Sequence, residues 1–376
     1  MRETLRLGRV SGIAIGVNWS VLVIFGLITL GLAAGRFPEL YPDLSVIAYA
    51  AAGLAAGLLF FASLLAHELS HALVAQRNGV GVDGITLWLF GGVARLTGEA
   101  PDPGADFRIA GVGPLVSIVL GIGFAAFAVI LDLAGVPGIV VGVFAWLGII
   151  NVVLAAFNLV PAAPLDGGRL LRAGLWRWRG DRDSAAVVAA RAGRGFGWLL
   201  VILGVASFAF GGPVGLWTAL IGWFLVNAAK AEEQQVVVGQ ALEGVRVSDV
   251  MSRRPTVAPR DVTVDRFLDY YVFPSRYSSF PVVDDDGRPV GLVTLNRVKE
   301  VAADRRTTTA VGQLSCPIDE LVIVGPDEPL SEVVPRMSGC ADGRALVVDH
   351  DRLIGIVTPS DVMRRLETAE LRRAEI

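Results

Sequence analysis

The sequence predicts a polytopic α-helical membrane protein, with six transmembrane helices and a membrane-associated β-hairpin, followed by a soluble α/β module. Three observations support this fold class. Of the 376 residues, 53% are hydrophobic and only 18% are charged, which is too apolar for an average soluble protein. Six apolar segments are long enough to span, or nearly span, a lipid bilayer. After Ala231 the composition becomes charged, and the sequence then repeats itself.

The six candidate spans all lie in the first 230 residues. The last two are short, rich in glycine and separated by Gly211-Gly212-Pro213, which is typical of a tight transmembrane hairpin. Because the basic N-terminus is not followed by a small-residue cleavage site, we interpret the first segment as a retained span rather than a signal peptide. The spans are Val10–Ala33, Ser45–Gln76, Phe107–Leu133, Ile139–Leu159, Phe196–Phe210 and Val214–Ala229.

Arginine placement predicts the orientation of these spans. An even number of spans puts both termini on one side of the membrane. The loop from Arg169 to Arg194 contains seven arginines, and the N-terminus adds three more, whereas the opposite loops contain only Arg36. The positive-inside rule therefore predicts a multi-pass protein of the cell (plasma) membrane with cytoplasmic N- and C-termini. An arginine loop that binds a partner is compatible with the same topology.

Residues 80–96, between the second and third spans, are rich in β-formers and interrupted by glycines. The segment is too short and too Gly-broken to span as a helix, so we expect a β-hairpin or re-entrant strand at the cytoplasmic membrane face. An extended peptide substrate could pair with a strand edge there, although a purely structural hairpin explains the pattern equally well. The candidate substrate-binding residues are Thr86, Leu87, Trp88, Gly91 and Gly92.

The C-terminal part contains an internal repeat, because residues 281–298 recur as residues 345–362. Each copy is typical of a strand, an acidic turn, a second strand and a helix start, and neither copy buries its apolar face alone. The two cysteines, Cys316 and Cys340, match no metal-binding spacing and indicate no disulfide framework. The predicted domains are a membrane domain (1–230), a linker (231–244), two repeats (245–305 and 306–368) and a tail (369–376).

The second span contains His67-Glu68-Leu69-Ser70-His71, with two of the three histidines of the chain. Residues four apart lie on the same face of a helix, so His67 and His71 can bind one metal ion. Glu68 then lies beside that ion, where its carboxylate can take a proton from an attacking water. Ionisable groups in an apolar helix are costly unless they have a partner. A metal site therefore explains these three residues better than a chance occurrence of the motif does.

A catalytic zinc site needs a third protein ligand, and the predicted topology selects a carboxylate. The remaining histidine, His350, lies in a polar turn of the soluble repeat and is a poor candidate. The fourth span returns to the depth of the histidines and ends in the segment Asn158–Arg169, which contains Asp166. Prolines before Asp166 stiffen the backbone and Gly167-Gly168 permits a tight turn after it, but an ordinary Asp-Gly turn explains the same pattern.

Other carboxylates fit the predicted topology less well. Asp132 is predicted on the wrong side of the membrane, and the acidic residues of the stretch 83–106 have no spanning helix to fix them. Two asparagines of the fourth span, Asn151 and Asn158, are seven residues apart and share a helix face. Their amides could bind substrate or a developing oxyanion, but helix–helix hydrogen bonding explains them as well.

The segment His67–His71 and the segment Asn158–Arg169 together resemble the site-2 protease family of intramembrane zinc metalloproteases. The likeness extends through Phe90-Gly91-Gly92-Val93 and Gly113-Pro114 and covers the first 230 residues. The resemblance implies one Zn²⁺ per chain, a general base, and a residue that assists substrate or transition-state binding. By this resemblance, His67, His71 and Asp166 would be the zinc ligands and Glu68 would be the general base. Asn158 would assist substrate or transition-state binding.

The C-terminal repeats resemble a tandem pair of CBS (cystathionine-β-synthase) domains, which often bind adenine nucleotides through a Gly-x-x-Thr-x-x-Asp-like stretch. The second repeat keeps this stretch as Gly355, Thr358 and Asp361, whereas the first has Arg297 where the aspartate would fall. The resemblance implies an adenine nucleotide as ligand and homodimerisation through the pair. A purely structural dimerisation module is the alternative.

Together these patterns predict an intramembrane zinc metalloendopeptidase that cleaves single-span membrane proteins in or near their transmembrane segment. Membrane lipid and an adenine nucleotide are its other expected partners, and the net charge of −3 gives no reason to expect nucleic acid. The short tether between the last span and the repeats suggests that nucleotide binding regulates proteolysis. A transporter or channel gated by the repeats, with the histidines on an ion pathway, is one alternative. A metal-binding protein without protease activity is another.

Overall fold

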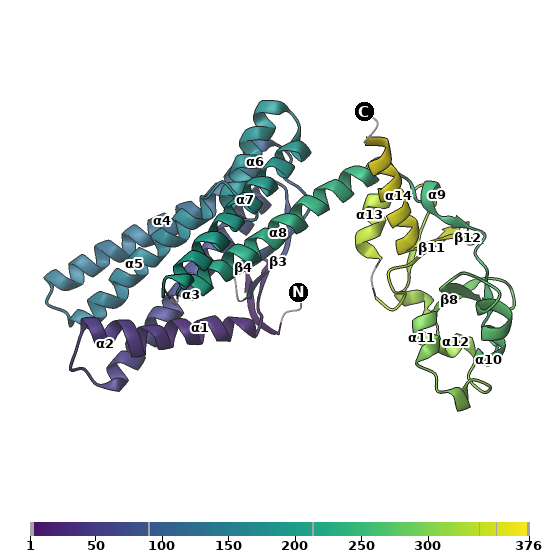
Figure 1. The fold of residues 1–376 in the computed structure, drawn as a ribbon, viewed down its shortest axis with the longest axis horizontal. Helices are drawn as coiled ribbons and strands as arrows, with labels where there is room; N and C mark the ends of the chain where they lie inside the picture. Colours follow the sequence, from purple (N-terminus) through teal and green to yellow (C-terminus); the bar gives the residue numbers. More distant parts are fainter. Residues whose placement is uncertain (1–3, 89–90, 213, 338, 351, 374–376) are drawn as a thin grey trace. The chain divides into compact units, whose positions relative to one another are not determined.

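The computed structural model describes residues 4–88, 91–212, 214–337, 339–350 and 352–373. Phe90 and Pro213, two residues of the sequence motifs above, lie outside these ranges. The chain divides into two compact units, Met1–Val236 and Val237–Ile376 (Figure 1). We call them the membrane unit and the C-terminal unit.

The membrane unit contains the six predicted spans, because six helices of the described chain are long and apolar enough to cross a bilayer. The first is composite: α1 (Ser20–Gly31) runs through a π-helical turn, η1 (Leu32–Arg36), into α2 (Phe37–Leu40). The others are single helices: α3 (Val46–Arg77), α4 (Pro103–Leu133), α5 (Gly138–Asn158), α7 (Arg182–Ala209) and α8 (Val214–Leu242).

Small residues and side-chain caps shape these helices. Asp102 caps α4 by accepting a hydrogen bond from the Ala105 N–H at 2.9 Å, so α4 begins four residues before the predicted Phe107. Gly121 of α4 and Gly148 of α5 let the two backbones approach closely: a Cβ added at Gly121 would lie 3.1 Å from the Gly148 carbonyl oxygen. The two helices run side by side in Figure 1.

The N-terminal prediction was wrong, because residues 10–17 are strands rather than the start of a helix. Strand β1 (Leu5–Val10) turns through Ser11 and Gly12, both at positive φ, into β2 (Ile13–Val17). Strand β2 pairs in parallel with β3 (Gly81–Trp88), which forms the expected hairpin with β4 (Gly91–Thr97). The hairpin is therefore one half of a four-stranded sheet with the order β1-β2-β3-β4.

The arginine-rich segment is helical rather than a loop. Four of its arginines lie on α6 (Asp166–Arg179) and the other three on the first half of α7. Between the two helices, Gly180 ends α6 in the left-handed conformation at φ 75°. The expected linker is also mostly helical, since α8 continues without a break from the last span to Leu242.

The C-terminal unit contains two four-stranded sheets, with orders β6-β7-β8-β9 and β10-β11-β12-β5. Each repeat contributes its first short strand to the sheet of the other: β5 (Ser252–Arg253) pairs with β12 (Arg352–Val357), and β9 (Cys316–Pro317) pairs with β8 (Pro289–Thr294). The remaining strands are β6 (Ala258–Pro259), β7 (Ser279–Val283), β10 (Val322–Val324) and β11 (Ala345–Asp349).

Short helices cover these sheets, and α14 (Pro359–Arg373) follows β12. The two cysteines form a disulfide between Cys316 and Cys340, with Cα atoms 5.5 Å apart. The sequence offered no sign of this pair, because its members are separated by 24 residues and meet only where the two repeats pack together. Apart from α14, the helical segments of the unit are α9 (Val247–Val250), α10 (Val264–Phe267), η2 (Leu268–Val272), α11 (Leu295–Lys299), η3 (Ala303–Arg305), α12 (Val311–Leu314), η4 (Ile318–Glu320), α13 (Leu330–Val333) and η5 (Val334–Arg336).

Candidate metal centre

Three side chains from two helices meet inside the membrane unit. His67 and His71 lie one turn apart on α3 and are only 2% and 6% exposed. The Oδ2 atom of Asp166, the first residue of α6, is 3.2 Å from the Nε2 atom of each histidine. The two Nε2 atoms are 3.1 Å apart. All three donor atoms therefore point into one small volume.

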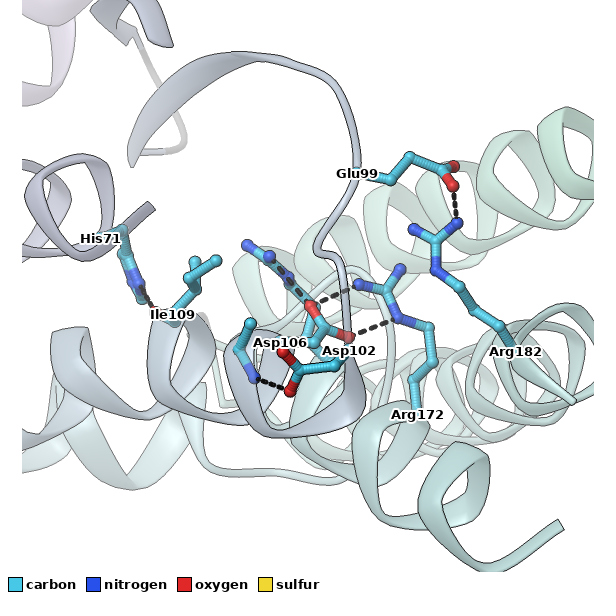
Figure 2. Close-up of polar contacts among 9 residues, drawn as sticks. His71, Glu99, Asp102, Asp106, Ile109, Arg172 and Arg182 are labelled. Atoms are coloured by element: carbon cyan, nitrogen blue, oxygen red, sulfur yellow. Dashed lines mark hydrogen bonds and ion pairs between the residues drawn. The ribbon is translucent and has the colours of Figure 1, made fainter. Parts of the chain in front are cut away.

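Helix α4 orients both imidazole rings. The Nδ1 of His71 donates a hydrogen bond to the Ile109 carbonyl oxygen at 2.5 Å (Figure 2), and this contact leaves the lone pair of a neutral ring on Nε2. The Nδ1 of His67 lies 2.9 Å from Oγ of the buried Ser117. Between these two residues, Gly113 packs directly on the rings, and a Cβ there would overlap the Nε2 atoms of both histidines.

Glu68 lies beside the three donors and is held by strand β4. Its carboxylate is within electrostatic reach of His67, His71 and Asp166, and it accepts a hydrogen bond from the backbone of Gly92. A side chain at Gly92 would collide with the Glu68 side chain, since a Cβ would lie 2.6 Å from Cδ. Glycine at this position therefore lets the strand approach the carboxylate closely.

Asp166 owes its position to close packing of the helix that follows it. We expected Gly167 and Gly168 to form a tight turn, but both lie in the first turn of α6. A Cβ on Gly168 would lie 2.6 Å from the backbone of Ala162, so these glycines let α6 pack on the segment 159–163.

A cluster of charged groups lies next to the three donors, and sequence reasoning missed it. Asp106 is completely buried in the first turn of α4 and binds two arginines of α6. Arg172 makes a two-pronged contact with it at 2.9 and 2.8 Å (Figure 2), and Arg169 adds a bond of 3.1 Å. The prediction that no spanning helix fixes Asp106 was wrong, because α4 begins before it.

The three donors fit a zinc ion. Two neutral imidazole nitrogens facing each other at 3.1 Å repel unless a cation lies between them. Ligands of a tetrahedral zinc with bonds of about 2.0–2.1 Å lie roughly 3.3 Å apart, and the observed separations of 3.1–3.2 Å are close to that. Imidazole with carboxylate is also a donor set that zinc accepts in catalytic sites.

The other residues predicted for the site are spread over the sheet and α5. Gly91 and Gly92 begin β4, whereas Thr86, Leu87 and Trp88 end β3, where Thr86 and Leu87 are buried. The Trp88 ring stacks edge-on against Phe224 of α8. Asn151 is buried in α5 and donates to the Leu147 carbonyl at 2.9 Å, while its Oδ1 has no hydrogen-bond partner in the described chain. Asn158 is the last residue of α5.

The two copies of the Gly-x-x-Thr-x-x-Asp-like stretch differ in their hydrogen bonds. In the second repeat, Asp361 accepts from the backbone N–H and hydroxyl of Thr358 at 2.9 and 2.7 Å. In the first repeat, Arg297 instead donates to the carbonyls of Leu314 and Cys340, and the buried hydroxyl of Thr294 has no partner among the described residues. The arginine thus joins the two repeats where the second repeat has a capping aspartate.

Comparisons with known proteins agree with this description. The model of Peptidase family M50 matches residues 55–137 and 134–202, and the CBS domain model matches 247–304 and 311–368. A protein of Mycobacterium tuberculosis named "Putative zinc metalloprotease Rip3" is 45% identical over 100% of this chain and 96% of its own length. A relative of the same description, sll0528 of Synechocystis, is 33% identical over 98% and 97% of the two chains.

Among solved structures, the site-2 protease from Methanocaldococcus jannaschii is 28% identical, covers 61% of this chain and 94% of its own, and has a TM-score of 0.44. The alignment with the mycobacterial relative extends over the whole of this chain. The chain therefore belongs to Peptidase family M50, the site-2 protease family of zinc metalloproteases, and carries a tandem pair of CBS domains after its membrane unit.

Proposed function

We propose that the chain binds one zinc ion through His67, His71 and Asp166 and hydrolyses a peptide bond in or near the transmembrane segment of a single-span membrane protein. The observation that carries this proposal is the convergence of three donor atoms within 3.2 Å of one another, with a glutamate beside them. Zinc, when bound, supplies Lewis acidity that acidifies water and polarises a carbonyl group.

Glu68 moves the proton in this proposal. A carboxylate oxygen of Glu68 accepts the proton of the attacking water and returns it to the nitrogen of the leaving amine. The hydrogen bond from the backbone of Gly92 keeps the carboxylate directed toward the three donors. The amide of Asn158, at the end of α5, contributes to substrate or transition-state binding.

Strand β4 provides a binding place for an unwound substrate. A transmembrane helix satisfies its own backbone hydrogen bonds and has little reason to open in lipid, so the enzyme must stabilise an extended segment. Among the described strands, β4 has a neighbour on one side only, and its free edge can pair with a peptide backbone. Because Gly92 of the same strand touches Glu68, a peptide paired there passes close to the general base.

The C-terminal unit is the regulatory part of this proposal. An intact motif in the second repeat supports binding of an adenine nucleotide there, next to Thr358 and Asp361. Helix α8 provides a direct mechanical connection, since it starts as the last span and ends at Leu242, which is buried in the core of the C-terminal unit. We further propose that the CBS pair mediates homodimerisation and that both termini are cytoplasmic.

The proton-transfer role of Glu68 is tested with the Glu68→Gln variant of the full chain, purified and assayed on a single-span membrane substrate. General acid–base catalysis contributes about 10²–10⁴-fold, so cleavage should fall at least that far while zinc content stays at the wild-type level. Glu39→Gln, at an exposed position of α2, is the matched control. Cleavage by Glu68→Gln at the wild-type rate would overturn the proton-transfer role of Glu68, whereas absence of cleavage by the zinc-loaded wild type would favour a transporter or scaffold.

A further inference from the structure

One face of α4 contacts both histidines of the metal centre and two arginines of α6, the helix that begins with Asp166. Four of its residues lie at successive helical turns: Asp106, Ile109, Gly113 and Ser117. Ile109 and Ser117 hold the imidazoles, and Gly113 lies against both rings. Asp106 is the member of this row that touches no donor, yet it is completely buried and charged. Its contacts lead instead to the helix that carries the third donor.

The two arginines bound by Asp106 follow Asp166 on α6 at a helical spacing. Arg169 comes one turn after Asp166 and Arg172 two turns after it, so both are rigidly connected to it through the helix. The two-pronged contact of Arg172 fixes direction as well as distance, because a planar guanidinium matches a carboxylate in one orientation. The rest of the N-terminal turn consists of glycines, which have no side chains to hold it.

We propose that Asp106 is a positioning residue of the metal centre: through Arg169 and Arg172 it sets the position of α6, and so places Oδ2 of Asp166 between the two histidines. Helix α4 then acts as a single template. Its carbonyl and hydroxyl groups orient the histidines, and its carboxylate orients the carboxylate ligand. This inference rests on the proposed function, in which Asp166 is a zinc ligand.

The test compares two changes of identical chemistry one turn apart on α4, Asp106→Asn and Asp102→Asn, in the purified full chain. Asp102 is a helix cap outside the cluster, and asparagine caps a helix as well as aspartate does. The readouts are zinc affinity by chelator competition, the visible absorption spectrum of the Co²⁺-loaded protein, and thermal unfolding. Loss of a residue that orients a metal ligand costs about 10–100-fold in metal affinity, and we expect that loss only in Asp106→Asn, together with an altered cobalt spectrum.

Arg172→Lys keeps the charge but loses the two-pronged contact, so it provides a milder variant if Asp106→Asn does not fold. We expect a smaller loss of zinc affinity and a shifted cobalt spectrum at an unchanged unfolding temperature. Wild-type affinity and spectrum in a folded Asp106→Asn or Arg172→Lys protein would overturn the positioning role. If Asp166→Ala also keeps its zinc, the proposed ligand set itself fails, and the two failures are thus distinguished.

Discussion

The three histidines of the chain show how differently the two units use polar residues. His67 and His71 are almost completely buried in α3, and each ring makes hydrogen bonds with another helix. His350 lies in a turn of the C-terminal unit, where its side chain is 93% exposed and pairs with the adjacent Asp349. A buried polar group in an apolar helix is costly without a partner, so its presence there indicates a function. An exposed histidine carries no such information.

The same contrast applies to charged groups. Asp106 is buried and contacts two arginines of another helix. In the C-terminal unit, Arg246 and Asp327 also form an ion pair, but their side chains are 63% and 80% exposed. Exposed pairs of this kind contribute about 0–1 kcal/mol. Substitutions in the membrane unit should therefore have larger and more specific effects than similar substitutions in the C-terminal unit.

Among these substitutions, the largest loss of zinc affinity is expected from Gly113→Ala, which can be compared with a second glycine of the same helix. A methyl group at this position would overlap the Nε2 atoms of both histidines. Overpacking of this kind costs about 1–3 kcal/mol, which corresponds to a loss of roughly 5- to 150-fold in zinc affinity. Gly123→Ala on the same helix has open space around it and is the matched control. Equal zinc affinities of the two variants by chelator competition would show that the rings are not held against α4.

A moderate effect is expected in the C-terminal unit, where the two repeats can be compared directly. Asp361→Ala removes the carboxylate that Thr358 contacts, and we expect nucleotide binding, measured by calorimetry with AMP and ATP, to weaken about tenfold or more. Arg297→Ala removes the residue at the matching position of the first repeat and should leave nucleotide affinity unchanged. Stronger weakening by Arg297→Ala would assign the nucleotide to the first repeat instead.

The smallest loss of zinc affinity is expected from Glu232→Gln on α8, the helix that continues into the C-terminal unit. Glu232 is within electrostatic reach of Arg169, Arg172 and Asp106, whereas its neighbour Glu233 pairs with arginines of α7. Loss of the Glu232 charge should lower zinc affinity by less than about fivefold, which corresponds to under 1 kcal/mol. Glu233→Gln should not change it. A larger loss in the Glu233 variant would contradict a specific connection of Glu232 to the arginines.

The sequence was sufficient to predict six long apolar helices, although not where the first begins, and to place His67 and His71 on one face of a helix. Both follow from local rules: a bilayer requires a long apolar segment, and a helix places residues four apart on one face. The candidacy of Asp166 needed only the added assumption that consecutive spans alternate in direction.

Two features that sequence reasoning missed, the N-terminal strands and the contacts of Asp106, depend on contacts between distant segments. The alternation of Ile13, Ile15 and Val17 is a strand pattern, but it merges into the apolar helix that follows, and its partner β3 begins at Gly81. Asp106 and Arg172 are likewise 66 residues apart. A local rule that counts arginines as loop residues could not show that α6 is a helix or that Arg169 and Arg172 pair with Asp106 of α4.

The central claim, that His67, His71 and Asp166 together hold one zinc ion, is tested most directly by the zinc content of the purified protein. We predict about one zinc per chain in the wild type and almost none in Asp166→Ala. The control His350→Ala changes a highly exposed histidine and should also hold about one zinc. Asp166→Ala purified with a full zinc ion per chain would contradict the claim.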